Sequence, residues 1–183
     1  MKISRSKISN LVFVVLIFLM LYRPTKVYLI RWLSFSPTIT AEEKQQVLSD
    51  YQWQLKDLQS TFVPIDSFRD KPLFISFWAT WCAPCIAELP SIQKLYDDYK
   101  HDVNFILISQ EDFGTITTFL NQNNYDLPTY NRVGKLPDIF QVSSIPTSYI
   151  IGSDGKVHVN KSGPANWNSN TVRDLLDKLI SEK

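Results

Sequence analysis

The chain contains 183 residues, of which 20% are charged, and its formal net charge is +1. This balance argues against the concentrated basic face that nucleic-acid binding requires, so we expect no nucleic-acid partner. Only two cysteines are present, too few for a scaffold stapled by disulfides or for a four-thiolate zinc site. The length fits one domain of about 130 residues with an N-terminal appendage.

The N-terminal residues carry the pattern of a membrane-targeting segment. The run from Leu11 to Tyr22 is apolar and follows three basic residues, Lys2, Arg5 and Lys7, as in a secretory signal. No Ala-x-Ala cleavage pattern follows, so we expect an uncleaved membrane anchor over residues 1–35 rather than a helix buried in the domain. Because the run is shorter than the roughly 20 residues of a spanning helix, the apolar patch from Val27 to Phe35 is expected to lie in the membrane interface.

A polar stretch, residues 36–49, is expected to link the anchor to the globular domain, with a short helix over residues 41–49. The domain is expected to occupy residues 50–183. It should begin with a β-hairpin that turns around residues 57–60, because alternating and β-branched residues flank this position.

The remaining elements alternate between strands and helices, as expected for an α/β domain. Continuous apolar runs predict buried strands, and apolar residues three and four positions apart predict amphipathic helices. In chain order we expect a strand at 73–78, a helix at 86–100, a strand at 103–109, a helix at 115–123, an insertion at 124–142 with a short helix near 137–141, strands at 147–151 and 156–160, and a helix at 169–180. The strands on either side of the first helix should pair in parallel with a right-handed crossover.

The two cysteines lie at the predicted start of the first helix, in Trp81-Cys82-Ala83-Pro84-Cys85. The positive end of the helix dipole and the unpaired backbone N–H groups favour a thiolate there, so Cys82 is the expected nucleophile. Pro84 is tolerated in the first turn and can hold the two sulfurs close. Cys85 should face inward and resolve the mixed disulfide that forms when Cys82 attacks a partner disulfide. The pattern predicts a thiol-disulfide oxidoreductase.

The run from Phe77 to Cys85, followed by Glu88 and Pro90, resembles the TlpA/ResA-like branch of the thioredoxin superfamily. The likeness covers residues 50–183 and includes Ile145-Pro146-Thr147-Ser148. It implies a thioredoxin-like fold, with a central mixed sheet flanked by helices, and a membrane-anchored thiol-disulfide oxidoreductase that uses no cofactor or metal. It also implies protein thiols or disulfides as substrates and a membrane protein as electron donor.

The resemblance assigns roles to residues around the cysteines. It implies that Pro146 is a cis-proline that faces the sulfurs and that the backbone of Ile145 pairs with an incoming peptide. It also implies that Glu88 belongs to the site, where it tunes the thiols or relays protons. Two simpler interpretations stay open: an ordinary proline at a strand start for Pro146, and a solvated helix carboxylate for Glu88. Trp81 is expected to border the cysteines as a contact surface and Trp78 to pack in the core.

Two features bear on the direction of the reaction. Ser76 lies six positions before Cys82, where thioredoxins resemble one another in carrying a buried aspartate, and this shifts attention to Glu88. The dipeptide Ala83-Pro84 contains no histidine or charge, unlike strongly oxidising relatives. We therefore expect a reductase of protein disulfides outside the cytoplasm, in the periplasm, and the family often implies a role in cytochrome c maturation.

Other functions fit the residues less well. A metal-binding or metal-delivery module on the same fold needs a third ligand, which His101 and His158, both expected at the surface, do not obviously supply. This module stays the alternative function. Peroxide reduction in related folds uses a Pro-x-x-x-Thr-x-x-Cys loop, but Ile75 and Ala79 occupy the proline and threonine positions. A purely structural disulfide does not explain the Trp-Cys-x-Pro-Cys context.

Overall fold

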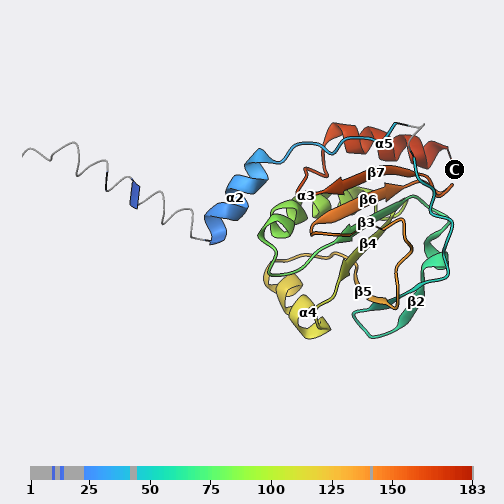
Figure 1. Cartoon of the computed structure of the whole chain (residues 1–183), viewed down its shortest axis with the longest axis horizontal. Helices are drawn as coiled ribbons and strands as arrows, with labels where there is room; N and C mark the ends of the chain where they lie inside the picture. The colour runs from blue at the N-terminus through green and yellow to red at the C-terminus, as the bar shows by residue number, and fades with distance from the viewer. Residues whose placement is uncertain (1–9, 11–12, 15–22, 42–44, 141, 183) are drawn as a thin grey trace, which may run out of the picture.

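The computed structural model of the chain describes residues 10, 13–14, 23–41, 45–140 and 142–182 (Figure 1). Apart from residues 13 and 14, the apolar run predicted as a membrane anchor lies outside this described part. No helix within the described residues is long and apolar enough to cross a membrane. The anchor therefore stays a prediction.

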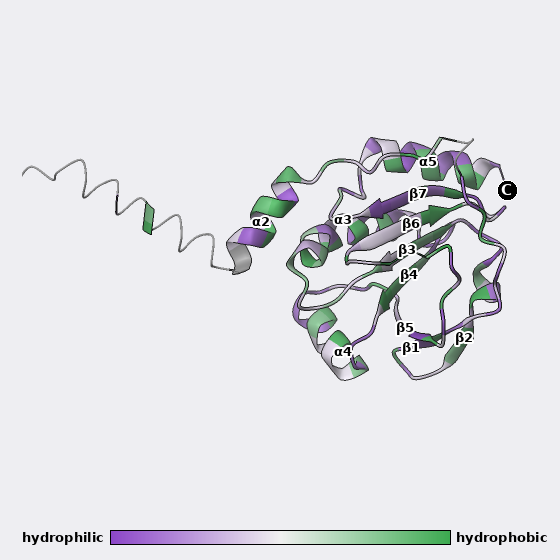
Figure 2. Cartoon of the chain, viewed as in Figure 1, coloured by the Kyte–Doolittle hydropathy of each residue, from purple (hydrophilic) through white to green (hydrophobic). Residues whose placement is uncertain are grey.

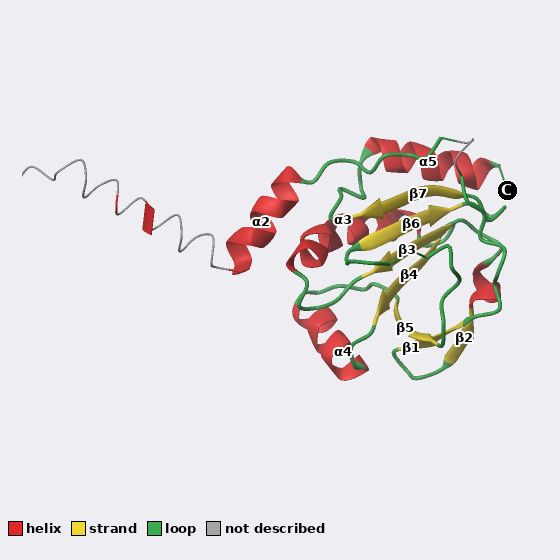
Figure 3. Ribbon diagram, viewed as in Figure 1, coloured by secondary structure: helices red, strands yellow, loops and turns green. Residues whose placement is uncertain are grey.

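A seven-stranded mixed sheet forms the centre of the domain, with the strand order β2-β1-β5-β4-β3-β6-β7 (Figure 3). Its strands are β1 (Gln54–Asp57), β2 (Phe62–Pro64), β3 (Leu73–Phe77), β4 (Asn104–Ser109), β5 (Thr129–Val133), β6 (Thr147–Ile151) and β7 (Val157–Ser162). The pairs β3–β4 and β4–β5 are parallel, whereas the other neighbours are antiparallel. The expected mixed sheet with a parallel core is confirmed.

The helices that cover the sheet lie on one face. The helical segments are α2 (Arg23–Leu33), the 3-10 helix η2 (Ile65–Phe68), α3 (Ala83–Tyr99), α4 (Phe113–Gln122) and α5 (Asn170–Ser181). Buried residues of α3, α4 and α5 form one apolar core with the same face of the central strands. A second core on the opposite face contains residues of the N-terminal segment, η2 and the insertion. The sheet thus has a helical face and a face covered mainly by loops.

Most of the expected elements are present. The predicted hairpin corresponds to β1 and β2, and the predicted strands and helices of the following chain correspond to β3, α3, β4, α4, β6, β7 and α5, with small shifts at their ends. The largest shift is at α3, which begins at Ala83 because Pro84 fits the first helical turn. The central strands β3 and β4 are fully or almost fully buried, as their apolar sequences predict, and Figure 2 shows the hydropathy of each element.

The insertion differs from the prediction in two ways. It contains strand β5, which pairs with β4 and with β1 and whose residues include the polar Asn131 and Arg132. The predicted short helix near residues 137–141 is wrong over its described part, which forms a turn closed by a 3.0 Å hydrogen bond from the Phe140 N–H to the Pro137 carbonyl. Phe140 is buried in the second core, so side-chain burial, not local helix formation, shapes this segment.

The helix predicted over residues 41–49 is also absent from the described residues of that stretch. Instead, Val47 forms an isolated antiparallel bridge with Lys156, and the Leu48 N–H donates to the Gly155 carbonyl at 2.8 Å. Gly155 has φ +82°, and a Cβ there would lie 2.7 Å from the Leu48 carbonyl oxygen, so only glycine permits this approach. Residues 45–49 are therefore held as an extended segment against the turn before β7.

The division into an anchor, a linker and a domain that starts at residue 50 stays a prediction. The described part of the expected anchor and linker contacts the domain at several points. The carbonyl of Phe35 accepts from Asn166 N–H at 3.0 Å, and Thr40 N–H donates to the His158 carbonyl at 2.7 Å. Arg31 of α2 donates to the carbonyl of Ala87 in α3 at 3.3 Å.

Candidate active site

The cysteine pair lies where β3 passes into α3, at the N-terminal end of that helix. Cys82 is the N-cap residue, and the backbone N–H of Cys85 donates to its sulfur at 3.2 Å. The two cysteines form a disulfide with a Cα–Cα distance of 5.2 Å. Cys85 is fully buried and Cys82 is 5% exposed. The expected position of Cys82 at the positive end of the helix, with Cys85 facing inward, is therefore confirmed.

The segment before β6 reaches the same position from a distant part of the chain. The Ile145–Pro146 peptide bond is cis, as the resemblance implied. The carbonyl oxygen of Ile145 lies 3.8 Å from the Cys82 sulfur. Antiparallel pairing of β6 with β3, which places Thr147 opposite Phe77, brings these residues together.

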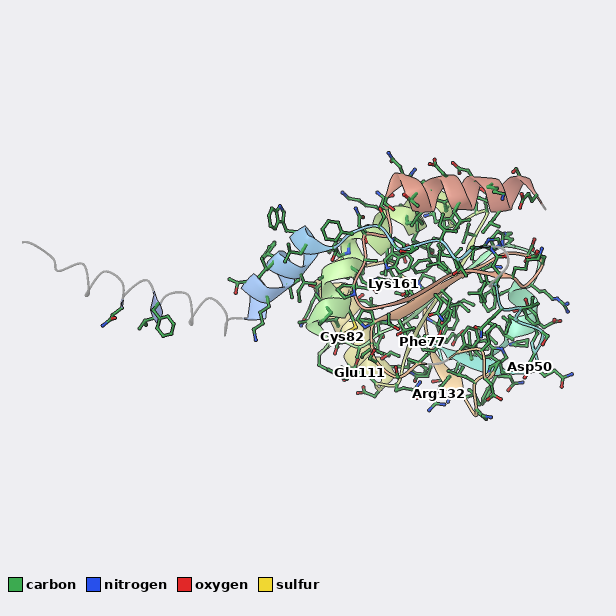
Figure 4. The ribbon with its side chains drawn as sticks, turned by 45° about the horizontal axis from the view of Figure 1, so that its top comes forward. Asp50, Phe77, Cys82, Glu111, Arg132 and Lys161 are labelled. Atoms are coloured by element: carbon green, nitrogen blue, oxygen red, sulfur yellow. A yellow bond between two sulfur atoms is a disulfide. The ribbon has the colours of Figure 1, made fainter. Side chains whose placement is uncertain are left out.

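The loop that precedes the cysteines is tied to the end of β4. Glu111 accepts a hydrogen bond from the backbone N–H of Thr80 and another from its hydroxyl, both at 2.7 Å. Asn131 of β5 in turn donates to the Glu111 carbonyl at 3.1 Å. Trp81, next to Thr80, is 66% exposed. Figure 4 shows Cys82 and Glu111 at the same end of the domain. The sequence places Glu111 at the carboxyl end of a strand, but nothing in it indicates this contact with Thr80.

Glu88 lies almost one helical turn after Cys85 and is only 1% exposed. Its Oε2 accepts hydrogen bonds from the Trp167 indole N–H at 3.0 Å and from the Ala165 N–H at 3.2 Å. Burial raises the pKa of Glu88 to about 8, and the hydrogen bonds from Trp167 and Ala165 oppose this rise. The interpretation of Glu88 as a solvated helix carboxylate is wrong, because the helix turns it into the core.

Ser76 occupies the position where thioredoxins carry a buried aspartate, and it is fully buried in β3. Its hydroxyl accepts a hydrogen bond of 2.9 Å from Ser148 of β6, which lies directly opposite it in the sheet. Within the described residues, Glu88 is the only buried carboxylate.

A cavity of about 710 Å³ opens beside the cysteine motif on the loop-covered face of the sheet. Trp81 and Ile145 line it next to the disulfide, and apolar residues that include Phe77 and Phe140 line its interior. Arg132, from the insertion, also lines the cavity. Phe77 and Arg132 are labelled in Figure 4. The insertion, whose role the composition did not indicate, therefore forms one wall of a cavity at the cysteines.

The structure also places the tryptophan and the two histidines that the sequence analysis discussed. Trp78 is 2% exposed, and its ring lies 5.6 Å from that of Phe119, which confirms core packing. His101 is exposed, but His158 is half-buried, with its Nδ1 3.1 Å from the Gln45 amide nitrogen. The expectation that His158 is a surface residue is wrong, because the segment before Val47 covers it. The described residues contain no group of three or more His, Cys, Asp or Glu side chains that could hold a metal ion.

Comparison with known proteins gives the family. A profile of the AhpC/TSA family matches residues 43–160, which span β1 to most of β7 and the cysteine motif. The chain belongs to the AhpC/TSA family. Its fold is thioredoxin-like, as the resemblance implied. This AhpC/TSA member has Ile75 and Ala79 at the proline and threonine positions of a peroxidase loop, and both side chains are buried.

Sequence relatives of this AhpC/TSA member are thiol-disulfide oxidoreductases. The chain is 30% identical over 122 residues to the thiol-disulfide oxidoreductase ResA of Bacillus thuringiensis subsp. konkukian, which covers 64% of this chain and 70% of that protein. It is 28% identical over 142 residues to the sporulation thiol-disulfide oxidoreductase A of Bacillus subtilis, covering 74% of this chain and 84% of that protein. With its Cys82–Cys85 disulfide, this AhpC/TSA chain is a thiol-disulfide oxidoreductase.

Solved structures show the same fold. The crystal structure of a secreted Mycobacterium tuberculosis disulfide oxidoreductase has a TM-score of 0.57 at 23% identity, covering 78% of this chain and 100% of that one. StoA from Bacillus subtilis has a TM-score of 0.53 at 22% identity, covering 68% of this chain and 92% of that one. These similarities support the thioredoxin-like architecture of the AhpC/TSA chain.

Proposed function

We propose that the chain reduces protein disulfides outside the cytoplasm through a dithiol–disulfide cycle of Cys82 and Cys85. The observation that carries the proposal is the position of Cys82 at the N-terminus of α3, where its sulfur accepts the Cys85 N–H. An N–H donor and the positive end of a helix dipole stabilise a thiolate relative to a thiol. Cys82 is thus the sulfur prepared to attack.

The cycle starts from the reduced pair. The Cys82 thiolate attacks one sulfur of the substrate disulfide, so that the substrate S–S bond breaks, a mixed disulfide forms and the first substrate sulfur leaves as a thiolate that takes up a proton. Cys85 then loses its proton and attacks the Cys82 sulfur. The Cys82–Cys85 bond forms, and the second substrate sulfur leaves. Two electrons pass from the enzyme to the substrate, and the two substrate sulfurs take up one proton released by Cys85 and one from the solvent. A dithiol on an electron-donor protein in the membrane restores the reduced pair.

Glu88 is the base that we propose for Cys85. It lies on the same helix, three positions after the resolving cysteine, and is buried beside the core that contains both cysteines. A pKa of about 8 allows Glu88 to hold or release a proton near neutral pH, which suits exchange with a thiol whose ordinary pKa is about 8.5. Ser76 leaves no carboxylate on β3 to share this role.

The substrate is proposed to meet the enzyme between Trp81 and the cis-proline segment. Trp81 presents a large exposed ring beside Cys82, and aromatic rings supply much contact area in protein interfaces. On the other side, the backbone of Ile145 lies two residues before β6 and close to the Cys82 sulfur. An extended peptide that pairs with this backbone would bring its disulfide to Cys82, with Pro146 and Pro84 shaping the two sides of the site.

The direction and pathway rest on the cysteine dipeptide and on the relatives. Ala83-Pro84 places no charge or histidine between the sulfurs, so nothing in it stabilises the reduced pair strongly enough to make an oxidant. The relatives named ResA, together with the family likeness of the cysteine motif, support the reduction of an apocytochrome c disulfide to its two thiols during cytochrome c maturation as the pathway.

The membrane location is supported by helix α2. The helix contains no acidic residue but includes the basic residues Lys26 and Arg31. Tyr28 and Trp32 are 68% and 81% exposed, and Trp and Tyr prefer the boundary between lipid and water. In Figure 2, α2 alternates between hydrophobic and hydrophilic bands outside the body of the domain. We infer that α2 lies at the bilayer surface after an N-terminal anchor, with the catalytic domain on the periplasmic side.

The proposed function can be tested with the full chain in detergent micelles. With a chemical dithiol as electron source, the protein should reduce the disulfides of a model protein such as insulin, and Cys82→Ser should abolish this activity. Cys85→Ser should instead accumulate a mixed disulfide with the substrate. A Cys82→Ser variant with full activity would show that the pair is not the redox centre.

A reporter fused to the C-terminus, active only outside the cytoplasm, tests the location.

A further inference from the structure

Three polar residues form a row across the helical face of the sheet, beneath α3. Strand register places Ser76 of β3 opposite Ser148 of β6, and Ser148 opposite Lys161 of β7. Directly opposed residues on antiparallel strands point to the same face. The next residues with the same orientation, Phe74, Ile150 and Val159, are apolar and pack in the core with α3 and α5. The row is therefore a polar line within an apolar surface.

The two serines of the row are linked by a hydrogen bond. Ser148 donates to Ser76 at 2.9 Å, and both are at most 1% exposed. A serine hydroxyl carries one hydrogen, so Ser76 accepts the Ser148 proton and keeps its own proton for another acceptor. Ser76 faces α3, which carries Glu88, and lowers the pKa of the Glu88 carboxyl, so this free proton can turn toward the carboxylate.

The carboxylate of Glu88 is held on one side only. Its Oε2 accepts from Trp167 and Ala165, whereas its buried Oε1 has no hydrogen-bond partner in the described part of the chain. The row lies on the sheet face that packs against α3, the helix that carries Glu88, whereas Oε2 is held by the segment before α5. A buried carboxylate that ionises needs a nearby positive charge, because desolvation penalises an unpaired charge heavily.

Lys161 is the cation that faces Glu88 from the sheet. It lies on β7, the edge strand, and is half-buried, and its charge lowers the pKa of Glu88. Figure 4 shows Lys161 at the same end of the domain as Cys82, with Asp50 at the other end. Arg31 of α2 donates to the carbonyl of Ala87, the residue before Glu88, rather than to the carboxylate.

We propose that Lys161 and the Ser76–Ser148 hydroxyl pair are positioning residues, which hold the Glu88 carboxylate from the sheet side and place a positive charge next to it. Lys161 favours the ionised form of Glu88, and the hydroxyl pair orients it. The consequence for deprotonation of Cys85 rests on the proposed function. The control of Glu88 ionisation does not, because it depends only on the arrangement of these side chains.

The test is a direct titration of Glu88 in the oxidised full chain. Glutamate labelled with ¹³C at the carboxyl carbon is introduced, Glu88→Gln identifies the Glu88 signal, and the midpoint of its chemical shift against pH is measured. Lys161→Met should raise the midpoint by about half a pH unit or more, and Lys161→Arg should restore it. Ser76→Ala should raise it by a smaller amount, because it removes a hydroxyl donor but no charge.

Lys156→Met is the matched control. It removes the same charge just before the same strand, but Lys156 is paired with Asp154 at 2.8 Å in the exposed turn, so the Glu88 midpoint should stay at its wild-type value. Lys161→Gln provides a second neutral variant if Lys161→Met does not give a folded spectrum. A Glu88 midpoint that is unchanged in the neutral Lys161 variant, or that moves equally in Lys156→Met, overturns the proposal.

This measurement separates the inference from the proposed function. The titration uses the closed disulfide and needs no electron transfer. A Glu88 midpoint that responds to Lys161 supports the inference even in a protein that fails to reduce insulin, which would overturn only the proposed function. The kinetic consequence is a reduction rate about threefold lower in Lys161→Met than in wild type at a pH below the midpoint, with Lys161→Arg restoring the rate.

Discussion

The two faces of the sheet are built differently and carry different parts of the site. The helical face contains the disulfide and the buried polar groups around Glu88, which lie on α3, β3 and β6 and on the segment before α5 that donates to Glu88. The loop-covered face contains the cavity beside Trp81, whose wall is supplied by the insertion. We propose that the helical face holds the groups that exchange protons and electrons and that the loop-covered face provides the surface that a protein substrate meets. The difference suggests that chemistry and substrate contact can be altered separately.

The largest expected effect is on the helical face, at the cysteine pair. Cys82→Ser should reduce disulfide reductase activity to the background of the chemical dithiol, because no other nucleophilic sulfur reaches the substrate. The loop-covered face should be unaffected, so binding of the substrate protein to the variant should persist. Activity is measured by insulin turbidity and binding by titration calorimetry. Residual activity comparable with that of wild type would contradict the assignment.

The second effect concerns Glu88 and the pH dependence of stability. The pKa of Glu88 is raised from 4.5 to about 8 in the folded chain, so between these values the native state binds a proton that the unfolded state has lost. The free energy of unfolding contributed by Glu88 is therefore full below pH 4.5 and falls as pH rises toward 8, by up to about 1.4 kcal/mol for each pH unit.

Glu88→Gln should remove this decline, because a glutamine stays neutral. Urea unfolding of both proteins at several pH values between 5 and 8 measures the difference. The variant should become more stable than wild type as pH increases, while its reductase rate falls because Cys85 has lost its base. Parallel pH curves for the two proteins would show that folding does not raise the pKa of Glu88.

The third effect tests the loop-covered face through Phe140. The centroid of its ring lies 5.6 Å from that of Trp53 and 5.1 Å from that of Tyr149. Phe140 therefore packs the insertion against the second core. Phe140→Ala should destabilise the chain by about 3 kcal/mol, in the range of large-to-small core substitutions. The pH at which Glu88 titrates should not change, because Glu88 lies on the other face. A joint change would mean that the two faces are coupled.

The smallest effect is expected at Trp81, which is exposed and packs against little. Trp81→Ala should lower the rate with a protein disulfide several-fold, leave the rate with a small disulfide reagent nearly unchanged, and alter stability by less than about 0.5 kcal/mol. Phe62→Ala, at a ring 58% exposed on edge strand β2, is the matched control and should change neither rate. Equal losses with both substrates would place Trp81 in the chemistry rather than in the contact surface.

The sequence predicts the features that depend on residues close together in the chain, and it misses those that depend on residues far apart. The strands β3 and β4 are predicted because they are continuous apolar runs. The redox function of the cysteines is predicted from their spacing and their position at the start of a helix. Strand β5 was missed because the polar Asn131 and Arg132 interrupt its pattern, and its pairing with β4 and β1 depends on distant segments.

The surroundings of the cysteines depend even more on long-range contacts. Glu88 is buried because Trp167, 79 positions away, donates to it, and spacing along α3 could not distinguish this from a solvated position. The sequence does not predict the bond from Glu111 to Thr80, because it spans 31 positions. The alignment of Ser76, Ser148 and Lys161 requires the strand register.

The reduction potential of the Cys82–Cys85 pair tests the central claim most directly. Equilibration of the full chain with glutathione buffers of known ratio, followed by alkylation and mass measurement of the trapped thiols, gives its value. A reductase should have a potential nearer to the roughly −270 mV of thioredoxin than to the roughly −120 mV of strong periplasmic oxidants. A value close to the oxidants would contradict the proposed direction.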